Sequence, residues 1–427
     1  MRVTDHARRG AARGLVLGAL VLAAVACRDD NSAAPGSSGP ATAVTTELVA
    51  TLPARATNVT EPSTLPAAEA PTATARPTAT LSPVAEYDFS GVSPIVERFI
   101  DERGLNGAAL IVVDRHDGIV DEEYWGDFGP ERVSLIASSS KMITAGVLLR
   151  LHDDGLLDID APVAAVVDWG AGNPTITPAQ LLSNSSGLVG LLPDPAYTPY
   201  VCQFLAAGTL QDCAANIFST PDDDGDIVAP DTEFRYGGAQ WQVAGAVAEV
   251  ASGKPWAQLI DEIYVQPCRL KTLAYNNHFT QLGAAGFEYP TAFDADPSTL
   301  QPTDNPNMEG GVYVAPPDYA ELLLMHLRDG RCGDTRVLSQ AALDRMHADR
   351  IGPTYGADAG PGTGYGMGWW VDRASGRISD GGAYGSVPWL DLEDGYGAYL
   401  VIEADSTTGR QLAQELFDVV EQAVTSN

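Results

Sequence analysis

Residues 136–152 read Ile-Ala-Ser-Ser-Ser-Lys-Met-Ile-Thr-Ala-Gly-Val-Leu-Leu-Arg-Leu-His. Apolar side chains recur at helical intervals over 141–152, and Asp153-Asp154-Gly155 supplies a stop. Further apolar residues cover most of the remaining circumference, so we expect this helix to be buried. Ser138 and Lys141 stand at its very start.

Ser138 and Lys141 form a Ser-x-x-Lys motif, whose spacing puts both side chains on one helix face about one turn apart. A serine hydroxyl is a poor nucleophile until a base takes its proton. Lysine can be that base where burial or nearby positive charge lowers its pKa. Backbone N–H groups at a helix start can also stabilise an oxyanion. The alternative is a surface helix cap with a solvated lysine, which the apolar helix argues against.

The composition excludes several classes of protein. The chain has 427 residues, 45% hydrophobic and 19% charged, so it is neither wholly disordered nor collagen-like and has ample material for a core. Asp and Glu number 56 against 25 Lys and Arg, and the net charge of −31 disfavours nucleic acid as a partner. Lysine chemistry has few candidates, because the only lysines are Lys141, Lys254 and Lys271.

The first 86 residues are predicted to be a signal peptide followed by a tether. Residues 1–26 combine a basic start with a short apolar run, and the Ala-Val-Ala before Cys27 resembles a bacterial lipobox. We therefore expect Cys27 to carry a lipid; an ordinary cleaved signal with a stray cysteine is the alternative. Residues 27–86 are rich in Pro, Ala, Thr and Ser and are expected to form an extended tether. This layout predicts an extracytoplasmic protein that contacts a bacterial membrane only through its N-terminal lipid.

Four cysteines remain once Cys27 is assigned to lipid, and an even number in an oxidising compartment favours disulfides. Three pairings are possible. We prefer Cys202 with Cys213, which share one short segment, and Cys268 with Cys332. Four buried free thiols are the alternative. No Cys/His spacing indicates zinc, and we expect neither a metal nor an organic cofactor.

Residues 87–427 read as a single α+β domain. Strands are predicted near both ends of this region and helices around them: strands at 107–114, 118–125, 367–373, 386–392 and 397–403, and helices at 93–102, 240–250 and 412–424. Strands collected at both ends, around a helix-rich middle, predict an antiparallel sheet built from both termini and a separate helical lobe.

Four segments in order along the body carry a resemblance to a known family: 136–145, 181–188, 231–236 and 308–313. The first resembles the active-site segment of serine β-lactamases and penicillin-binding proteins. The second, Leu-Leu-Ser-Asn-Ser-Ser-Gly-Leu, is similar to a segment of the branch that contains class C enzymes, D-aminopeptidases and esterases. The resemblance spans about residues 90 to 425. It implies a β-lactamase/transpeptidase-like fold, an antiparallel sheet flanked by helices with a helix-rich lobe.

The resemblance also implies roles for individual residues. Ser138 would be the acylated nucleophile, Lys141 its proton acceptor and Tyr236 a second general acid/base. The oxyanion hole would use the backbone N–H groups of Ser138 and of a strand residue near Ala383. A lone tyrosine is usually a packing residue, but the setting of Tyr236 before Gly237-Gly238 and a helix favours the catalytic role.

Two departures from the family pattern affect the expected substrate. The second motif, Tyr-x-Asn, ends here in Gly238, so a carboxamide that orients the lysine and a substrate carbonyl is missing; Asn184 or Gln240 would be the candidates to replace it. The third motif, a basic residue followed by x-Gly, falls at 380–382, where the chain has Asp380 and Gly382. An aspartate there would repel a substrate carboxylate, which favours neutral or cationic substrates.

The sequence therefore predicts a serine hydrolase that acts through an acyl-enzyme on ester or amide bonds of a small molecule or peptide, as a monomer. Two alternatives stay open. The altered second and third motifs fit a catalytically silent member of the same fold that acts as a surface binding protein. The predicted location fits a DD-peptidase or β-lactamase, although Asp380 argues against both.

Overall fold

The computed structural model describes residues 87–426 except 192–196, 220–224, 282–288 and 290–295. The predicted signal peptide, Cys27 and the tether lie outside these described residues. Among the described helices, none is both long and apolar enough to cross a membrane.

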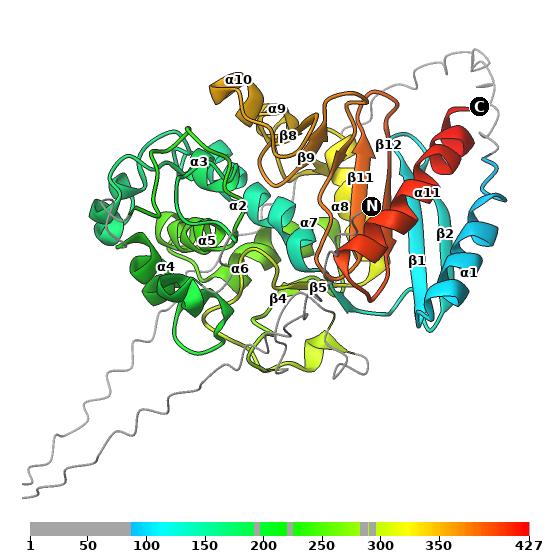
Figure 1. The fold of residues 1–427 in the computed structure, drawn as a ribbon, viewed down its shortest axis with the longest axis horizontal. Helices are drawn as coiled ribbons and strands as arrows, with labels where there is room; N and C mark the ends of the chain where they lie inside the picture. The colour runs from blue at the N-terminus through cyan, green and yellow to red at the C-terminus, as the bar shows by residue number, and fades with distance from the viewer. Residues whose placement is uncertain (1–86, 192–196, 220–224, 282–288, 290–295, 427) are drawn as a thin grey trace, which may run out of the picture. The chain divides into compact units, whose positions relative to one another are not determined.

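A seven-stranded sheet joins the two ends of the body, as the sequence predicts (Figure 1). Its order is β2-β1-β12-β11-β10-β9-β8, and the neighbouring strands pair antiparallel. The first strand and the last are β1 and β12 of this order, and they are direct neighbours, with Ala109 paired to Val401. The strands are β1 (Gly107–Asp114), β2 (Gly118–Gly126), β8 (Thr363–Tyr365), β9 (Trp370–Asp372), β10 (Ile378–Ser379), β11 (Ser386–Asp391) and β12 (Tyr396–Val401).

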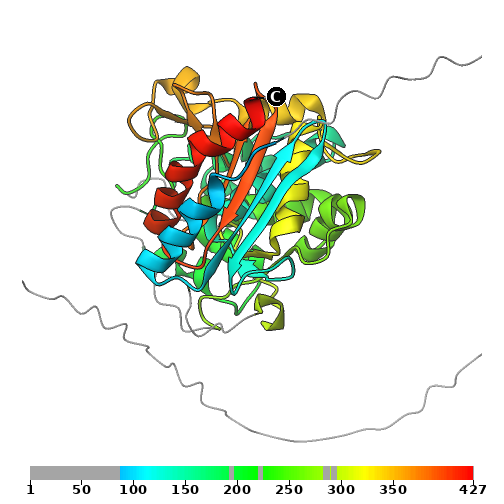
Figure 2. The ribbon, with the colours of Figure 1, turned by 90° about the vertical axis from the view of Figure 1, so that its right-hand side faces the viewer.

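Strand β1 is apolar on both faces because helices cover both faces of the sheet. Ala108, Leu110 and Val112 pack towards α1 (Val92–Arg103) and α11 (Ser406–Thr425). The alternate residues of β1 face the main core, which includes α8 (Pro316–Leu327). Figure 2 shows α1 and α11 on one side of the sheet and α8 on the other.

The middle of the chain forms the predicted helical lobe, with two small sheets. Its helices include α2 (Lys141–Asp153), α3 (Pro178–Leu182), α4 (Leu210–Phe218), α5 (Ala239–Ser252), α6 (Trp256–Ile260) and α7 (Gln266–Cys268). Beyond the lobe come α9 (Gln340–His347) and α10 (Ile351–Tyr355). The small sheets consist of β3 (Ser134–Leu135), β5 (Val312–Val314) and β4 (Ala274–Tyr275), and of β6 (Arg331–Cys332) and β7 (Thr335–Arg336).

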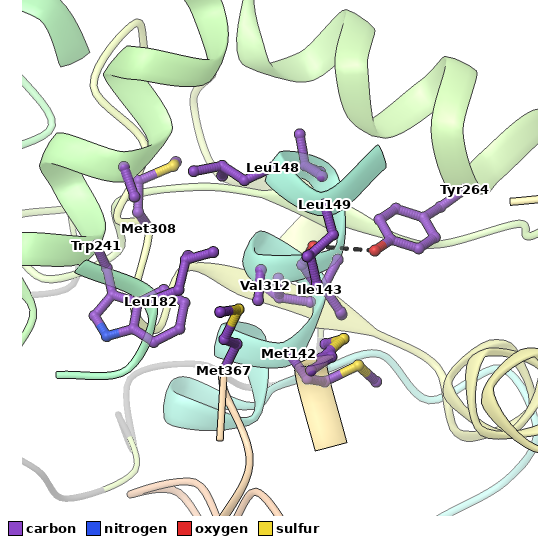
Figure 3. Packing of buried hydrophobic residues seen from close by; sticks show 14 of the residues in the cluster. Met142, Ile143, Leu148, Leu149, Leu182, Trp241, Tyr264, Met308, Val312 and Met367 are labelled. Atoms are coloured by element: carbon purple, nitrogen blue, oxygen red, sulfur yellow. Dashed lines mark hydrogen bonds between the residues drawn. The ribbon is translucent and has the colours of Figure 1, made fainter. Parts of the chain in front are cut away.

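Helix α2 is buried as predicted, between the lobe and the sheet. Figure 3 shows Met142, Ile143 and Leu148 among side chains from other segments, with the Tyr264 hydroxyl donating to the Ile143 carbonyl at 3.1 Å. A Cβ on Gly146 would lie 1.9 Å from that hydroxyl, so only glycine permits this approach. The tight packing fixes the helix whose first turn carries the Ser-x-x-Lys motif.

The predicted strand at 367–373 is shorter in the structure, where β9 begins at Trp370. Gly368 has φ +86°, and the Gly366 N–H donates to the Trp369 carbonyl at 2.8 Å, so these residues form a turn. The predicted helix at 412–424 begins six residues earlier, because α11 starts at Ser406 after the N-cap Asp405. The other predicted strands and helices agree with the structure to within a few residues at each end.

The preferred cysteine pairing is confirmed. Cys202 bonds to Cys213, and Cys268 bonds to Cys332. The first bridge ties the turn 198–204 to α4, close in sequence. The second closes a separation of 64 residues and links α7 to β6.

Loss of the longer bridge should cost more stability than loss of the shorter one. Chain entropy alone assigns about 4 kcal/mol to the Cys268–Cys332 loop and about 3 kcal/mol to the Cys202–Cys213 loop. Urea unfolding of the two double Cys→Ser variants, under identical oxidising conditions, measures both values. A larger loss for the Cys202/Cys213 variant would contradict this order.

Candidate active site

The candidate nucleophile lies on a 3₁₀ turn, Ala137–Ser140, that leads directly into α2. Ala137 has φ +46°, a conformation that costs an ordinary residue about 1 kcal/mol and that turns the chain sharply before Ser138. The three consecutive serines differ in environment. Ser139 and Ser140 are fully buried, whereas Ser138 is partly exposed.

The two buried serines hold the turn in place. Ser139 Oγ donates to the Asp380 carbonyl at 2.6 Å, and Ser140 Oγ donates to the Ala137 carbonyl at 2.6 Å. Ser140 Oγ also accepts the Val312 N–H at 3.1 Å. Ser138 is therefore the serine of this turn that a substrate can reach.

Lys141 is fully buried, and three oxygen atoms surround its ammonium group. Nζ lies 3.0 Å from Ser138 Oγ, 3.1 Å from the Glu309 carbonyl and 3.2 Å from Glu309 Oε2. Burial by itself would lower the pKa of Lys141. Attraction to Tyr236 and Glu309 outweighs that effect and raises the pKa above its usual value. The resting amine is thus protonated, contrary to the lowered pKa that the sequence interpretation invoked for a lysine base.

Tyr236 is brought to the same point from the segment that precedes α5. Its ring centroid lies 4.7 Å from Lys141 Nζ, within the range of a cation–π contact. Desolvation raises the pKa of the Tyr236 phenol, although the charge of Lys141 opposes this shift. The structure thus brings Ser138, Lys141 and Tyr236 together.

Asn184, which the sequence interpretation proposed as a substrate-binding residue, is held by hydrogen bonds in the protein interior. The residue is fully buried, and its Oδ1 accepts hydrogen bonds from Gln240 Nε2 at 2.7 Å and Trp241 Nε1 at 3.2 Å. Gln240 is also committed to the interior, where its Oε1 accepts from Ser186 Oγ. Through these hydrogen bonds both amides brace the start of α5.

Asp380 is also misplaced by the sequence interpretation, which expected it to meet a substrate carboxylate. It has no exposed surface, and its Oδ2 accepts the Met142 N–H at 3.3 Å at the first turn of α2. Burial raises the pKa of the Asp380 carboxyl well above its usual value. A carboxyl buried against α2 does not meet a substrate carboxylate, so its effect on substrate choice is that a basic residue is absent at this position.

Gly382 and Ala383 lie beside the nucleophile, in a turn that leads into β11 and not within the strand itself. A Cβ on Gly382 would lie 2.0 Å from the Ile136 carbonyl and 3.2 Å from Ser139 Oγ. Glycine is needed there because the backbone passes so close to the nucleophile turn. Ala383 packs against the small cluster of Leu135, Ala137 and Tyr384. Its role as the second oxyanion donor stays a prediction.

The sequence interpretation missed Glu309, the acidic partner of Lys141. The side chain of Glu309 is 8% exposed and that of Lys141 0%, so this is a buried ion pair. Glu309 lies in the resemblance segment 308–313, but no pattern there indicates that it would point at a lysine 168 positions away.

An aromatic group beside Tyr236 was also missed. The Trp370 ring centroid lies 5.1 Å from that of Tyr236, and the Phe234 centroid lies 5.9 Å from that of Trp370. Phe234 and Trp370 are both partly exposed. The sequence shows that the segments around Phe234 and Trp370 contain aromatic residues, but it gives no indication that the two segments meet.

No group of three or more potential metal ligands occurs among the residues that the structure describes. Residues 220–224, which include three consecutive aspartates, lie outside the described part of the chain.

A sequence profile described as Beta-lactamase matches residues 92–421. The chain belongs to the beta-lactamase family. Among curated relatives of this family member, Penicillin-binding protein 4 of Amycolatopsis lactamdurans is 27% identical, over 74% of this chain and 85% of the relative. Esterase EstB of Burkholderia gladioli is 28% identical, over 42% of this chain and half of the relative.

Solved structures of the family share the fold. A putative beta-lactamase from Bacteroides dorei superposes with a TM-score of 0.62 at 26% identity, covering 79% of this chain and all of that one. EstCE1, a hydrolase with promiscuous acyltransferase activity, has a TM-score of 0.63 at 21% identity and covers 78% of this chain and 98% of that one. The β-lactamase/transpeptidase-like fold expected from the sequence is therefore confirmed.

Asp380→Asn should change the pH dependence of stability in a defined direction. A carboxyl with a raised pKa binds its proton more tightly in the folded chain, so the stability that Asp380 contributes falls as pH rises above the usual carboxyl range. The amide has no such dependence and can still accept the Met142 N–H.

The free energy of unfolding of Asp380→Asn, relative to that of the parent chain, should therefore increase from acidic to neutral pH. Urea titrations at several pH values measure this difference. The exposed turn variant Glu393→Gln is the control. Parallel pH curves for Asp380→Asn and the parent would show that Asp380 is ionised in the folded state.

Proposed function

We propose that this beta-lactamase-family chain is a serine hydrolase that acts through an acyl-enzyme, with Ser138 as the nucleophile. The observation that carries the proposal is the 3.0 Å contact between Ser138 Oγ and Lys141 Nζ, at a point that the Tyr236 ring also adjoins. Hydrolase relatives such as EstB support the same reaction class.

The proposed reaction begins when Lys141, in its deprotonated form, takes the Ser138 proton as Oγ bonds to the substrate carbonyl carbon. The carbonyl oxygen gains negative charge, which the N–H groups of Ser138 and Ala383 stabilise. Tyr236 gives a proton to the leaving alcohol or amine as the bond to it breaks, and Lys141 restores that proton. Water then attacks the ester carbonyl on Ser138. Tyr236 and Lys141 take the proton of the water and return it to Ser138 Oγ as the bond to the acyl group breaks.

Neutral esters and amides are the proposed substrates, on a revised physical ground. The third-motif position holds a buried acid where a base would bind a substrate carboxylate. The exposed parts of Phe234 and Trp370, beside Tyr236, offer apolar surface to a substrate group. Both features favour uncharged substrates, and the net charge of −31 adds long-range repulsion of anions.

The proposed setting is extracytoplasmic, with the chain anchored to a bacterial membrane by a lipid on Cys27. The disulfides Cys202–Cys213 and Cys268–Cys332 support an oxidising compartment. Electrophoretic mobility and radiolabelled-palmitate incorporation, compared between the parent and Cys27→Ser, test the anchor.

Ser138→Ala should abolish both ester turnover and labelling by a fluorophosphonate. Loss of the attacking oxygen should lower the rate with p-nitrophenyl butyrate by at least about 10³-fold. Ser375→Ala is the control, because it removes a serine hydroxyl from an exposed turn and leaves the turn Ala137–Ser140 intact.

Mass spectrometry of the labelled full-length chain locates the adduct. An adduct on Ser138 of the parent and of Ser375→Ala, but not of Ser138→Ala, is the expected result. A well-folded parent with neither adduct nor turnover would indicate a silent family member that acts by binding.

Turnover should depend on substrate charge when the leaving group and the acyl length are held constant. We expect kcat/KM for p-nitrophenyl butyrate to exceed that for the anionic mono-p-nitrophenyl succinate by at least about tenfold. The two esters share a leaving group and have similar acyl length. Equal values, or efficient turnover of the anionic cephalosporin nitrocefin, would rule out a preference for neutral substrates.

A further inference from the structure

Gly238 leaves a space beside Lys141 that other side chains fill. A Cβ on Gly238 would lie 2.1 Å from Glu309 Oε1 and 2.2 Å from Gln203 Oε1. At this position the family resemblance expects an asparagine, whose side chain would occupy the same volume. Glu309 and Gln203 approach from distant segments, before β5 and beside Cys202, so the space is filled by tertiary contacts and not by local sequence.

Glu309 uses this position to hold Lys141 by two contacts. Its Oε2 and its backbone carbonyl both accept hydrogen bonds from Nζ, at 3.2 Å and 3.1 Å. Neither oxygen can donate, so together they occupy two of the three tetrahedral positions on the nitrogen. The third position is directed at Ser138 Oγ, 3.0 Å away. The Tyr236 phenol also hydrogen-bonds to the amine, so loss of a proton leaves the lone pair on the side of Ser138 and Tyr236.

We propose that Glu309 replaces the carboxamide absent at Gly238 as the positioning residue for Lys141, and that its charge moves the working pH range of the site towards alkaline values. The kinetic part of this inference rests on the proposed serine hydrolase function. A carboxylate differs from a carboxamide here in one respect, because it stabilises the ammonium form of its partner.

The groups around Lys141 support this assignment of the charge. The Tyr236 ring centroid lies 4.7 Å from Lys141 Nζ. Asp380, which follows β10, also acts on the charge of the amine. Both have raised pKa values. The phenols of Tyr365 and Tyr384 interact with Glu309 and also have raised pKa values. Of the two carboxyl groups that act on Lys141, Glu309 is the one that forms an ion pair with Nζ, at 3.2 Å.

Glu309→Gln should lower the pKa of Lys141 while preserving its position. The amide oxygen can still accept from Nζ but carries no charge, so the titration midpoint should fall by about one unit or more. Lysine-selective ¹³C NMR of the full-length chain measures this directly, because only three lysines give signals and Lys141→Gln identifies one of them. Glu262→Gln is the matched control, since it neutralises the partner of Lys254 at a surface pair.

The rate of fluorophosphonate labelling should report the same change. In the parent, labelling should increase towards alkaline pH as the raised pKa of Lys141 is approached. In Glu309→Gln the rising limb of the plot of labelling rate against pH should move to lower pH, by the same number of units as the NMR titration midpoint of Lys141. A purely structural role for Glu309 would lower the rate without moving the limb.

Gly238→Ala provides a second variant that leaves Glu309 intact. Its Cβ should displace the carboxylate from Lys141 and lower the lysine pKa in the same direction. Gly381→Ala is its control, because a Cβ at that nearby position has nothing within 4 Å.

Unchanged Lys141 titration in both Glu309→Gln and Gly238→Ala would overturn the inference. If the lysine midpoint shifts as expected but the parent neither turns over esters nor labels, the electrostatic inference stands and the proposed hydrolase function fails. If the parent labels on Ser138 but the midpoint and the limb stay fixed, the function stands and the role of Glu309 fails.

Discussion

Lys141 carries its ammonium group at a position with no exposed surface, and a buried charge is stable only when opposite charge and hydrogen-bond acceptors replace the lost water. Glu309 supplies both a carboxylate and a carbonyl, and Ser138 supplies the remaining oxygen. The same contacts that pay for burial also aim the amine at the serine. The stability of the buried lysine and the reactivity of the site therefore depend on the same contacts of Lys141 Nζ with Glu309 and Ser138.

The rest of the fold holds these groups in register. Helix α2 is fixed by core packing on its apolar circumference, and the serines that follow Ser138 bind the nucleophile turn to the sheet side and to β5. Tyr236 is held by the lobe, where Asn184 and Gln240 brace the start of α5. The candidate site thus lies where the sheet, the first turn of α2 and the lobe converge, and each contributes one functional side chain or backbone turn.

The departures from the family motifs have different physical meanings once their surroundings are known. Asp380 occupies a position associated with substrate charge, but it is buried against α2 and acts within the protein interior. Gly238 removes a side chain, yet the volume is occupied by Glu309 and Gln203. A motif position therefore predicts where chemistry is expected, whereas the identity of the group that performs it depends on which segments meet there.

Local pattern was enough for much of this protein. Helical periodicity identified α2, alternation and apolar runs identified β1, β2, β11 and β12, and the spacing of three placed Ser138 beside Lys141, because these features depend on residues close together in the chain. Close spacing of Cys202 and Cys213 likewise indicated their pairing. The directions in which Asp380 and Asn184 point, and the approach of Glu309 to a lysine 168 residues earlier, were decided only by tertiary packing. Burial and long-range contact set the charge state of an ionisable group, and neither is encoded in its immediate sequence neighbours.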